Sequence, residues 1–447
     1  MKRLILLSVL MVLLVGASLG ALGKTTVTFW TTLIEPKRME VQQQLAAEFM
    51  ALHPNIEVEV VPVDENELPT RIAAAYAAGN LPDLVRVPLD YVIGWAEEGI
   101  LDVEAATALL TEMGLGTFAA GALELAKVEG GYAALPADGW GQLILYRKDL
   151  FEEHDLPVPD NWSAILQAAM VLHDPPNLYG IEVGTDPNQV FTQQVFEHFA
   201  LSNGARLVDE AGNIDLTTPE FIDTLRFYKL LATQFTPPGN IYWLQTRADF
   251  LAGKAAMIVW SPYILDELAG LRDSVPVTAE FPEGTPRLHE RVGIVTAFSG
   301  PDGAPAQYGY VLYHGITVDA DLEATQSFVK FLLSDGYATW LSMAPEGMFP
   351  MRPEYIDQWQ QLEVGVDRRA PLAELYPAEV IEAIAKGVES LDRWGFAAAR
   401  GPCVSSIYGT KTVIDILRRY MDGEVPTAEQ AAQMMEEQVR GLEGCGG

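Results

Sequence analysis

The beginning of the chain alternates short β-rich segments with longer segments of helical spacing. Residues 25–30 are rich in β-branched and aromatic side chains and predict a first strand. Residues 36–52 carry apolar side chains at helical spacing, and residues 56–61 alternate apolar and polar side chains as a second strand. This order of strand, helix and strand predicts an α/β protein with mostly parallel sheets.

The next segment predicts a ligand-facing edge of this sheet. Residues 84–87 read as a third strand, which Pro88 ends because it lacks a backbone donor. A helix is expected at about 91–98, with Asp90 as its cap. Asp90 and Tyr91 therefore follow the carboxyl end of a strand, where open α/β sheets bind ligands.

The second half of the chain continues the alternation of helices and short strands. The buried strand ending at Trp260 places Ser261 and Tyr263 directly after it. The other predicted elements are a helix at 190–201, strands at 293–296 and 308–318, and a helix at 322–334. With 447 residues, the chain is long enough for two domains, each with its own core.

The first 23 residues have the pattern of a cleavable signal peptide. Lys2 and Arg3 precede an apolar run over residues 4–15, and residues 21–23 form a small-x-small cleavage site. The run is short for a membrane span. Because no cysteine lies near the cleavage site, we expect a periplasmic or extracellular protein that is not a lipoprotein.

Charge and cysteine content narrow the classes of partner. Without residues 1–23 the net charge is −34, which repels phosphate backbones and argues against nucleic-acid binding. Cys403 and Cys445 are the only cysteines, and in an oxidising compartment they could pair or remain apart. Neither they nor the scattered histidines have the spacing of a metal site, and no metal or cofactor is expected.

Several separated motifs resemble one family. They are AGNLPDL at 78–84, LYRKDLF at 145–151, FLAGKAAM at 250–257 and EGMFPMR at 346–352. Together they are similar to the extracellular solute-binding proteins of ABC importers, and among these to the maltose-binding-protein-like, carbohydrate-binding group (family 1). The resemblance covers nearly the whole chain after residue 23.

The resemblance implies a two-lobed type II periplasmic-binding-protein fold. Each lobe would be a mostly parallel sheet flanked by helices, and a hinge near Pro136, Gly293 and Ser334 would join the lobes. The implied N-terminal lobe comprises residues 24–136 plus 293–334, and the implied C-terminal lobe comprises 137–292 plus 335–447.

The same resemblance implies ligand-binding positions in the cleft between the lobes. Asp90 matches the position of an acidic side chain that binds sugar in the family. Tyr91 stands beside it, where an arginine is found in the family. Trp140, Gln194 and Tyr263 match further sugar-binding positions, although most of the matched residue types differ from those of maltose-binding protein. Further candidates come from their places at predicted strand ends, namely Thr31, Thr32, Asp138, Gln142, Trp260, Ser261 and Tyr310.

The expected function is capture of a carbohydrate and its delivery to the permease subunits of an ABC importer, by a monomer without enzymatic activity. One alternative is a receptor for glycerol phosphate or a phosphodiester, in which Arg352 and Arg400 would clamp the anion. Another is a secreted glycan-cleaving enzyme with paired carboxylates. The sequence contains no nucleophile elbow, P-loop, HExxH or EF-hand motif.

Overall fold

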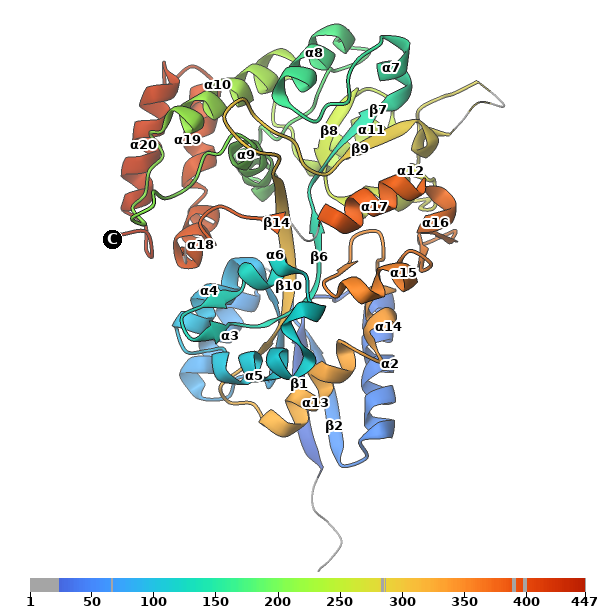
Figure 1. Cartoon of the computed structure of the whole chain (residues 1–447), viewed down its shortest axis with the longest axis vertical. Helices are drawn as coiled ribbons and strands as arrows, with labels where there is room; N and C mark the ends of the chain where they lie inside the picture. The colour runs from blue at the N-terminus through green and yellow to red at the C-terminus, as the bar shows by residue number, and fades with distance from the viewer. Residues whose placement is uncertain are drawn as a thin grey trace, which may run out of the picture.

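The chain folds into two α/β lobes that lie one above the other and are joined by crossing segments (Figure 1). The structure is a computed structural model that describes residues 24–446 except 66, 283–284, 286, 388–390 and 397–399. The predicted signal peptide therefore lies outside the described residues. None of the described helices is both long enough and apolar enough to cross a membrane.

The lower lobe in Figure 1 is built on a mixed sheet with the strand order β11-β6-β10-β3-β1-β2, and β14 also pairs with β10. Its central strands run parallel, because β2 and β3 flank β1 in the same direction. The strands are β1 (Thr25–Thr31), β2 (Ile56–Pro62), β3 (Leu84–Pro88), β6 (Leu135–Gly141), β10 (Gln307–Ile316), β11 (Phe349–Pro350) and β14 (Leu391–Asp392).

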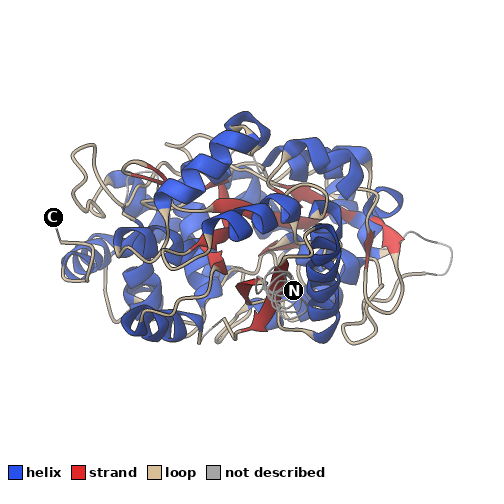
Figure 2. Ribbon diagram, turned by 90° about the horizontal axis from the view of Figure 1, so that it is seen from below, coloured by secondary structure: helices blue, strands red, loops and turns tan. Residues whose placement is uncertain are grey.

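Helices enclose this sheet, so that the strands lie in the interior when the molecule is viewed from below (Figure 2). Their apolar faces bury residues such as Leu45, Phe49 and Phe328, and Phe328 packs against both Phe29 of β1 and Phe49 of α2. The helices are α2 (Pro36–Leu52), α3 (Leu68–Ala78), α4 (Leu89–Glu97), α5 (Val103–Met113), α6 (Ala120–Glu124), α13 (Leu322–Leu332), α14 (Tyr337–Leu341) and α15 (Ile356–Trp359). A short hairpin of β4 (Lys127–Val128) and β5 (Gly131–Tyr132) packs beside α5.

The upper lobe surrounds a smaller sheet of order β8-β7-β9, formed by β8 (Met257–Trp260), β7 (Leu143–Arg147) and β9 (Val292–Val295). Helices flank it, and α19 and α20 pack against α10 at one side. The upper helices are α7 (Lys148–Glu153), α8 (Trp162–Leu172), α9 (Val190–Ser202), α10 (Pro219–Gln234), α11 (Trp243–Leu251), α12 (Leu265–Leu268), α16 (Leu372–Leu375), α17 (Ala378–Gly387), α19 (Thr412–Met421) and α20 (Ala428–Arg440). A pair of short strands, β12 (Glu363–Val364) and β13 (Ala370–Pro371), precedes α16.

The sheets differ from the expected mostly parallel arrangement. The named strands of the smaller sheet are all antiparallel neighbours. In the larger sheet β10 runs antiparallel to both β3 and β6, because it enters from the opposite lobe. The expectation of mostly parallel sheets is therefore wrong for the named strands of the smaller sheet. In the larger sheet it holds for the β2-β1-β3 part and for the pairing of β14 with β10.

Strand pairing also divides the chain differently from the predicted boundaries. Residues 293–295 lie in β9 and pair with β7 of the smaller sheet. Residues 349–350 lie in β11 and pair with β6 of the larger sheet. The chain crosses between the sheets at Gln142, which separates β6 from β7, and again over residues 296–306. We propose that these segments form the hinge between the lobes.

A helix near the end of the chain contacts both lobes. Helix α18 (Gly401–Thr410) packs against α4 of the lower lobe and continues into α19 of the upper lobe. Gly401 is required at this contact, because a Cβ there would come within 2.5 Å of Ile93. A disulfide joins Cys403 of α18 to Cys445 after α20, and this bond anchors α18 to the upper lobe.

Candidate functional site

A cavity of about 790 Å³ lies at the junction of the lobes, a volume within the usual range of small-molecule sites. Residues from both lobes line it: Asp90, Tyr91, Trp140, Gln142, Asn188, Gln189, Val190, Phe191, Gln194, Trp243, Arg247, Trp260, Ser261, Tyr263, Glu267, Ser405, Tyr408, Gly409 and Lys411. Within the described residues, no group of three or more His, Cys, Asp or Glu side chains is arranged to hold a metal ion.

The lower wall presents an acidic acceptor beside aromatic faces. Helix α4 begins after Pro88, so Asp90 lies in its first turn and does not cap it, contrary to the prediction from the sequence. One Asp90 oxygen accepts a hydrogen bond from Tyr310 at 3.2 Å. The strand register places Trp140 of β6 opposite Tyr310 of β10, and their rings stack with centroids 5.6 Å apart. Tyr91 stacks in the same way on Trp95 of α4.

The upper wall is built where β8 ends. Trp260 is the last residue of β8, and Ser261 directly precedes the short helix η2 (Pro262–Ile264) that carries Tyr263. Trp260 packs against Phe191 of α9 and against Trp243, which begins α11 and is 41% exposed at the rim. These rings give the cavity flat apolar faces next to the polar side chains of neighbouring residues.

The face of Tyr263 also meets the lower lobe. A Cβ at Gly347 would come within 2.2 Å of the Tyr263 ring, so a residue without a side chain is required at that contact. Gly347 belongs to the EGMFPMR segment, which leads into β11 of the larger sheet. The sequence therefore brings a glycine from one lobe against a cavity-lining ring of the other.

Lys411 lines the cavity in a strained backbone conformation. It joins α18 to α19 with φ 59°, a left-handed value that is unfavourable for residues with a Cβ. Its ammonium group donates a hydrogen bond at 2.9 Å to the backbone oxygen of Asn188, which also lines the cavity.

We expect Lys411→Gly to raise the free energy of unfolding by about 1 kcal/mol, because glycine adopts this conformation without strain. Urea unfolding followed by circular dichroism measures the change. Lys330→Gly in α13 is the matched control, and it should lower the free energy of unfolding by about 1 kcal/mol because the residue is helical there. A loss of stability in Lys411→Gly would contradict the prediction.

Glu267 is a buried carboxylate on the upper wall, only 3% exposed. One of its oxygens accepts a hydrogen bond from Arg247 at 3.0 Å, and the Arg247 guanidinium lies over the ring of Trp243. Burial raises the pKa of Glu267 to about 7, although Arg247 opposes the increase. The neighbouring Asp266 also has a raised pKa, mainly through burial, and Arg272 pairs with it at 2.8 Å.

This pKa predicts a pH dependence of stability with a definite sign. Between pH 4.5 and pH 7 the folded protein retains a proton on Glu267 that the unfolded chain releases, so stability falls as pH rises. We expect the unfolding free energy of the wild type, relative to that of Glu267→Gln, to fall by up to about 3 kcal/mol over this window. Thermal unfolding of both proteins across the window measures it, and parallel pH profiles would count against the prediction.

The sequence-predicted residues divide into those that line the cavity and those that lie elsewhere. Asp90, Tyr91, Trp140, Gln142, Gln194, Trp260, Ser261 and Tyr263 line it. Tyr310 lies directly behind Asp90 and Trp140. Their function as ligand contacts stays a prediction.

The side chains of Thr31, Thr32 and Asp138 make hydrogen bonds to other residues of the lower lobe. The Thr31 hydroxyl accepts a hydrogen bond from the backbone of Leu33. Arg86 donates to Thr32 at 3.0 Å and to Asp138 at 2.8 Å, and Asp138 is fully buried. Arg86 thus links Thr32 to Asp138, and none of the three predicted residues is among those that line the cavity.

Arg352 and Arg400, the two arginines that were expected to bind a phosphate group in the alternative function, also lie outside the cavity. Arg352 is buried in the lower lobe, where it donates to the backbone of Leu333 and pairs with Glu354. Arg400 lies at the start of α18 and donates to the backbone oxygen of Gly212, in a separate hollow of the upper lobe.

Sequence reasoning missed the contributions of α11, α12 and α18 to the cavity. Trp243 and Arg247 have a spacing that equally suits a surface helix, and Glu267 lies in a separate short helix. Ser405 and Tyr408 lie far in the sequence from Asp90, Trp140 and Trp260, which also line the cavity. The one sequence feature that could have indicated these cavity residues is the pair of aromatic residues at 242–243, at the start of α11.

Three comparisons with known proteins agree. The family model described as "Bacterial extracellular solute-binding protein" matches residues 36–339. The chain is 30% identical to a putative ABC transporter periplasmic-binding protein YcjN of Escherichia coli, over 78% of this chain and 79% of the relative. It is 27% identical to a maltotriose-binding protein of Pyrococcus abyssi, over 65% and 62%.

Among solved structures, maltose-bound MalE3 of T. maritima superimposes with a TM-score of 0.69 at 20% identity, covering 93% of this chain and 99% of that one. This likeness shows the fold, which is the two-lobed type II periplasmic-binding-protein fold. The chain belongs to the bacterial extracellular solute-binding proteins and is a solute-binding component of an ABC transporter.

Proposed function

We propose that this protein captures a carbohydrate, a mono- or oligosaccharide, in the interlobe cavity and delivers it to membrane permease subunits. The observation that carries the proposal is the lining of the cavity. The lining combines the rings of Trp140, Trp243 and Trp260 with the hydrogen-bonding groups of Asp90 and Gln194. A sugar ring has an apolar CH face and polar edges, so this combination complements it.

The names of relatives support a sugar-like ligand, since the compared proteins include one that binds maltotriose and one with maltose bound. The phosphate alternative loses its proposed anchors, because neither Arg352 nor Arg400 lines the cavity. The cationic side chains that do line it are engaged, Arg247 with Glu267 and Lys411 with the backbone of Asn188. A neutral polyhydroxylated ligand fits these contacts best.

The proposal is tested by a thermal-shift screen of the protein without residues 1–23. The panel contains glucose, maltose, maltotriose, mannitol and glycerol 3-phosphate. A compound that binds only the folded state stabilises it by about 2.7 kcal/mol at a hundredfold excess over its Kd. A shift with one or more sugars supports the proposal, whereas a shift with glycerol 3-phosphate alone would replace it with the phosphate reading.

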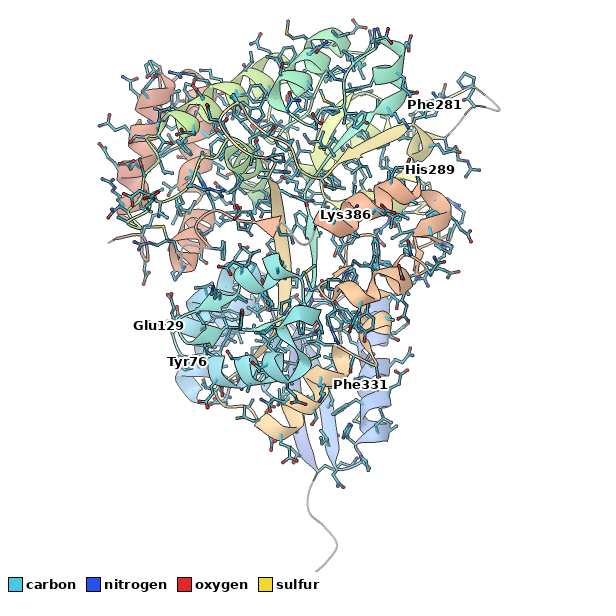
Figure 3. The ribbon with its side chains drawn as sticks, viewed as in Figure 1. Tyr76, Glu129, Phe281, His289, Phe331 and Lys386 are labelled. Carbon is cyan, nitrogen blue, oxygen red and sulfur yellow. A yellow bond between two sulfur atoms is a disulfide. The ribbon has the colours of Figure 1, made fainter. Side chains whose placement is uncertain are left out.

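Titration calorimetry of site variants locates the binding. Trp140→Ala should weaken binding of the active sugar about tenfold or more, because it removes a stacking face. Tyr76→Ala is the matched control, since Tyr76 is an exposed aromatic residue on the lower lobe away from the cavity (Figure 3). Equal affinities of Trp140→Ala and the wild type would place the sugar elsewhere.

Prolonged incubation of the protein with an oligosaccharide, followed by chromatography of the sugars, distinguishes a receptor from a glycan-cleaving enzyme. We infer a receptor, because the matching family model and the relatives are solute-binding proteins. A glycan-cleaving enzyme would need two carboxyls placed on either side of the scissile bond, one of which donates a proton. Release of shorter sugars that disappears in Asp90→Asn would favour the enzyme.

We also infer that the protein acts outside the cytoplasm as a monomer, after cleavage at residues 21–23. The mass and N-terminal sequence of the protein secreted by a bacterial host test the cleavage. Light scattering with and without the active sugar tests the monomer.

A further inference from the structure

The guanidinium of Arg393 is completely buried directly behind the cavity. Its Nε donates to Glu197 at 2.9 Å, and one of its terminal nitrogens donates to Asp90 at 3.2 Å. Aromatic rings enclose the charge, with the centroids of Tyr308 and Tyr408 at 4.5 and 5.1 Å from the guanidinium carbon. The ion pair with Glu197 therefore lies in a dry environment, where electrostatic interactions are stronger than at the surface, whereas Asp90 is partly exposed to the cavity.

Glu197 makes further hydrogen bonds besides its ion pair with Arg393. Glu197 accepts hydrogen bonds from the backbone of Trp394 at 2.7 Å and from the Tyr408 hydroxyl at 2.5 Å. Burial alone would lower the pKa of Arg393, but Glu197 and the neighbouring acidic groups raise it well above its ordinary value. The guanidinium thus stays charged at any pH at which the protein is folded.

These partners come from different lobes. Asp90 lies on α4 of the lower lobe, and Glu197 lies on α9 of the upper lobe. Arg393 directly follows β14, which pairs with the crossing strand β10 between the lobes (Figure 1). The Ser405 hydroxyl of α18 also donates to the backbone oxygen of Asp90, so a cavity residue is bound from both lobes.

We propose that Arg393 is a positioning residue that presents the Asp90 carboxylate to the bound sugar and ties this contact to Glu197 of the opposite lobe. A carboxylate has about four acceptor sites, and among the described side chains Arg393 and Tyr310 occupy one site on each Asp90 oxygen. The remaining sites accept hydroxyl groups. The arrangement therefore favours a ligand that presents hydroxyl donors to Asp90.

Two experiments test this inference, and only the first, a binding measurement with maltotriose as the probe, rests on the proposed function. Arg393→Lys keeps the charge but loses the forked geometry that reaches both carboxylates. We expect it to weaken maltotriose binding about tenfold in the wild-type background and to have almost no further effect in an Asp90→Asn background. An equal loss in both backgrounds would show that Arg393 acts only through general structure and would overturn the positioning role.

A second arm needs no ligand and stands even if maltotriose does not bind. Small-angle scattering of the ligand-free protein compares wild type with Arg393→Lys and with Glu197→Gln. The glutamine is an isostere whose amide oxygen can still accept from the Trp394 backbone and whose NH2 group can donate to the Tyr408 oxygen. We expect both variants to increase the radius of gyration, because the lobes are held together less firmly. An unchanged scattering profile in both would overturn the tie between lobes.

Arg147→Lys is the matched control for both arms. Arg147 is also a buried arginine, but its partner Asp149 lies in the same lobe, and it stacks over Phe281 at the far end of the upper lobe (Figure 3). It should change neither maltotriose affinity nor the radius of gyration. Glu197→Gln keeps the test decisive if Arg393→Lys fails to fold.

Discussion

Replacing Arg393 with methionine is expected to lower the free energy of unfolding by about 3–5 kcal/mol, because it leaves Glu197 buried without a compensating charge. Glu197 is fully buried, and burial already raises its pKa despite the presence of Arg393. Removal of the guanidinium also leaves Asp90 without its ion pair. Urea unfolding followed by tryptophan fluorescence and by circular dichroism measures the change.

The double variant Arg393→Met/Glu197→Gln separates charge burial from lost packing. It should recover a large part of the stability, because no unpaired carboxylate remains in the interior. If the double variant is as unstable as Arg393→Met, the loss comes from packing of the long side chain instead. A loss below about 1 kcal/mol in the single variant would contradict the prediction, since that is the value of an exposed pair.

Replacing Cys403 and Cys445 with serine is expected to lower the free energy of unfolding by about 4 kcal/mol. The disulfide closes a loop of 42 residues, and cross-linking a loop of that length removes this much chain entropy from the unfolded state. Thermal unfolding of the oxidised wild type and of the serine variant measures the difference.

The serine variant should also bind its sugar less tightly, because the disulfide anchors α18, which brings Ser405 and Tyr408 to the cavity. Wild-type protein treated with a reductant is the control, and it should reproduce the behaviour of the variant. A melting temperature that is the same with and without reductant would mean that the packing of α18 on α4 holds the segment by itself.

Local patterns in the sequence were sufficient for the elements nearest the beginning of the chain. The helix predicted at 36–52 is α2, because its apolar spacing and flanking prolines leave few alternatives. Asp90 and Tyr91 were found because they follow a strand end, and Trp140 was found through the resemblance; the comparison with known proteins confirms the family that the motifs resemble. Their roles in binding stay predictions.

The features that the sequence did not predict depend on contacts between distant parts of the chain. Asp90 was expected to cap α4, but its carboxylate turns instead toward Arg393, which lies 303 residues later. Similarly, Asp138 follows the pattern of a cleft residue, yet Arg86 and Trp340 hold it in the interior. No spacing rule reveals which buried arginine a carboxylate will meet.

The link at Gln142 has a consequence for the size of ligand that the protein can hold. A single residue separates β6 of one sheet from β7 of the other, and this buried residue is fixed through its backbone to Tyr308 and through its side chain to His198. Such a short connection permits rotation of the lobes but gives no slack for them to move apart. Because Gln142 itself lines the cavity, the space between the two walls beside it has a fixed upper limit, and only a ligand that fits this space can contact both walls there.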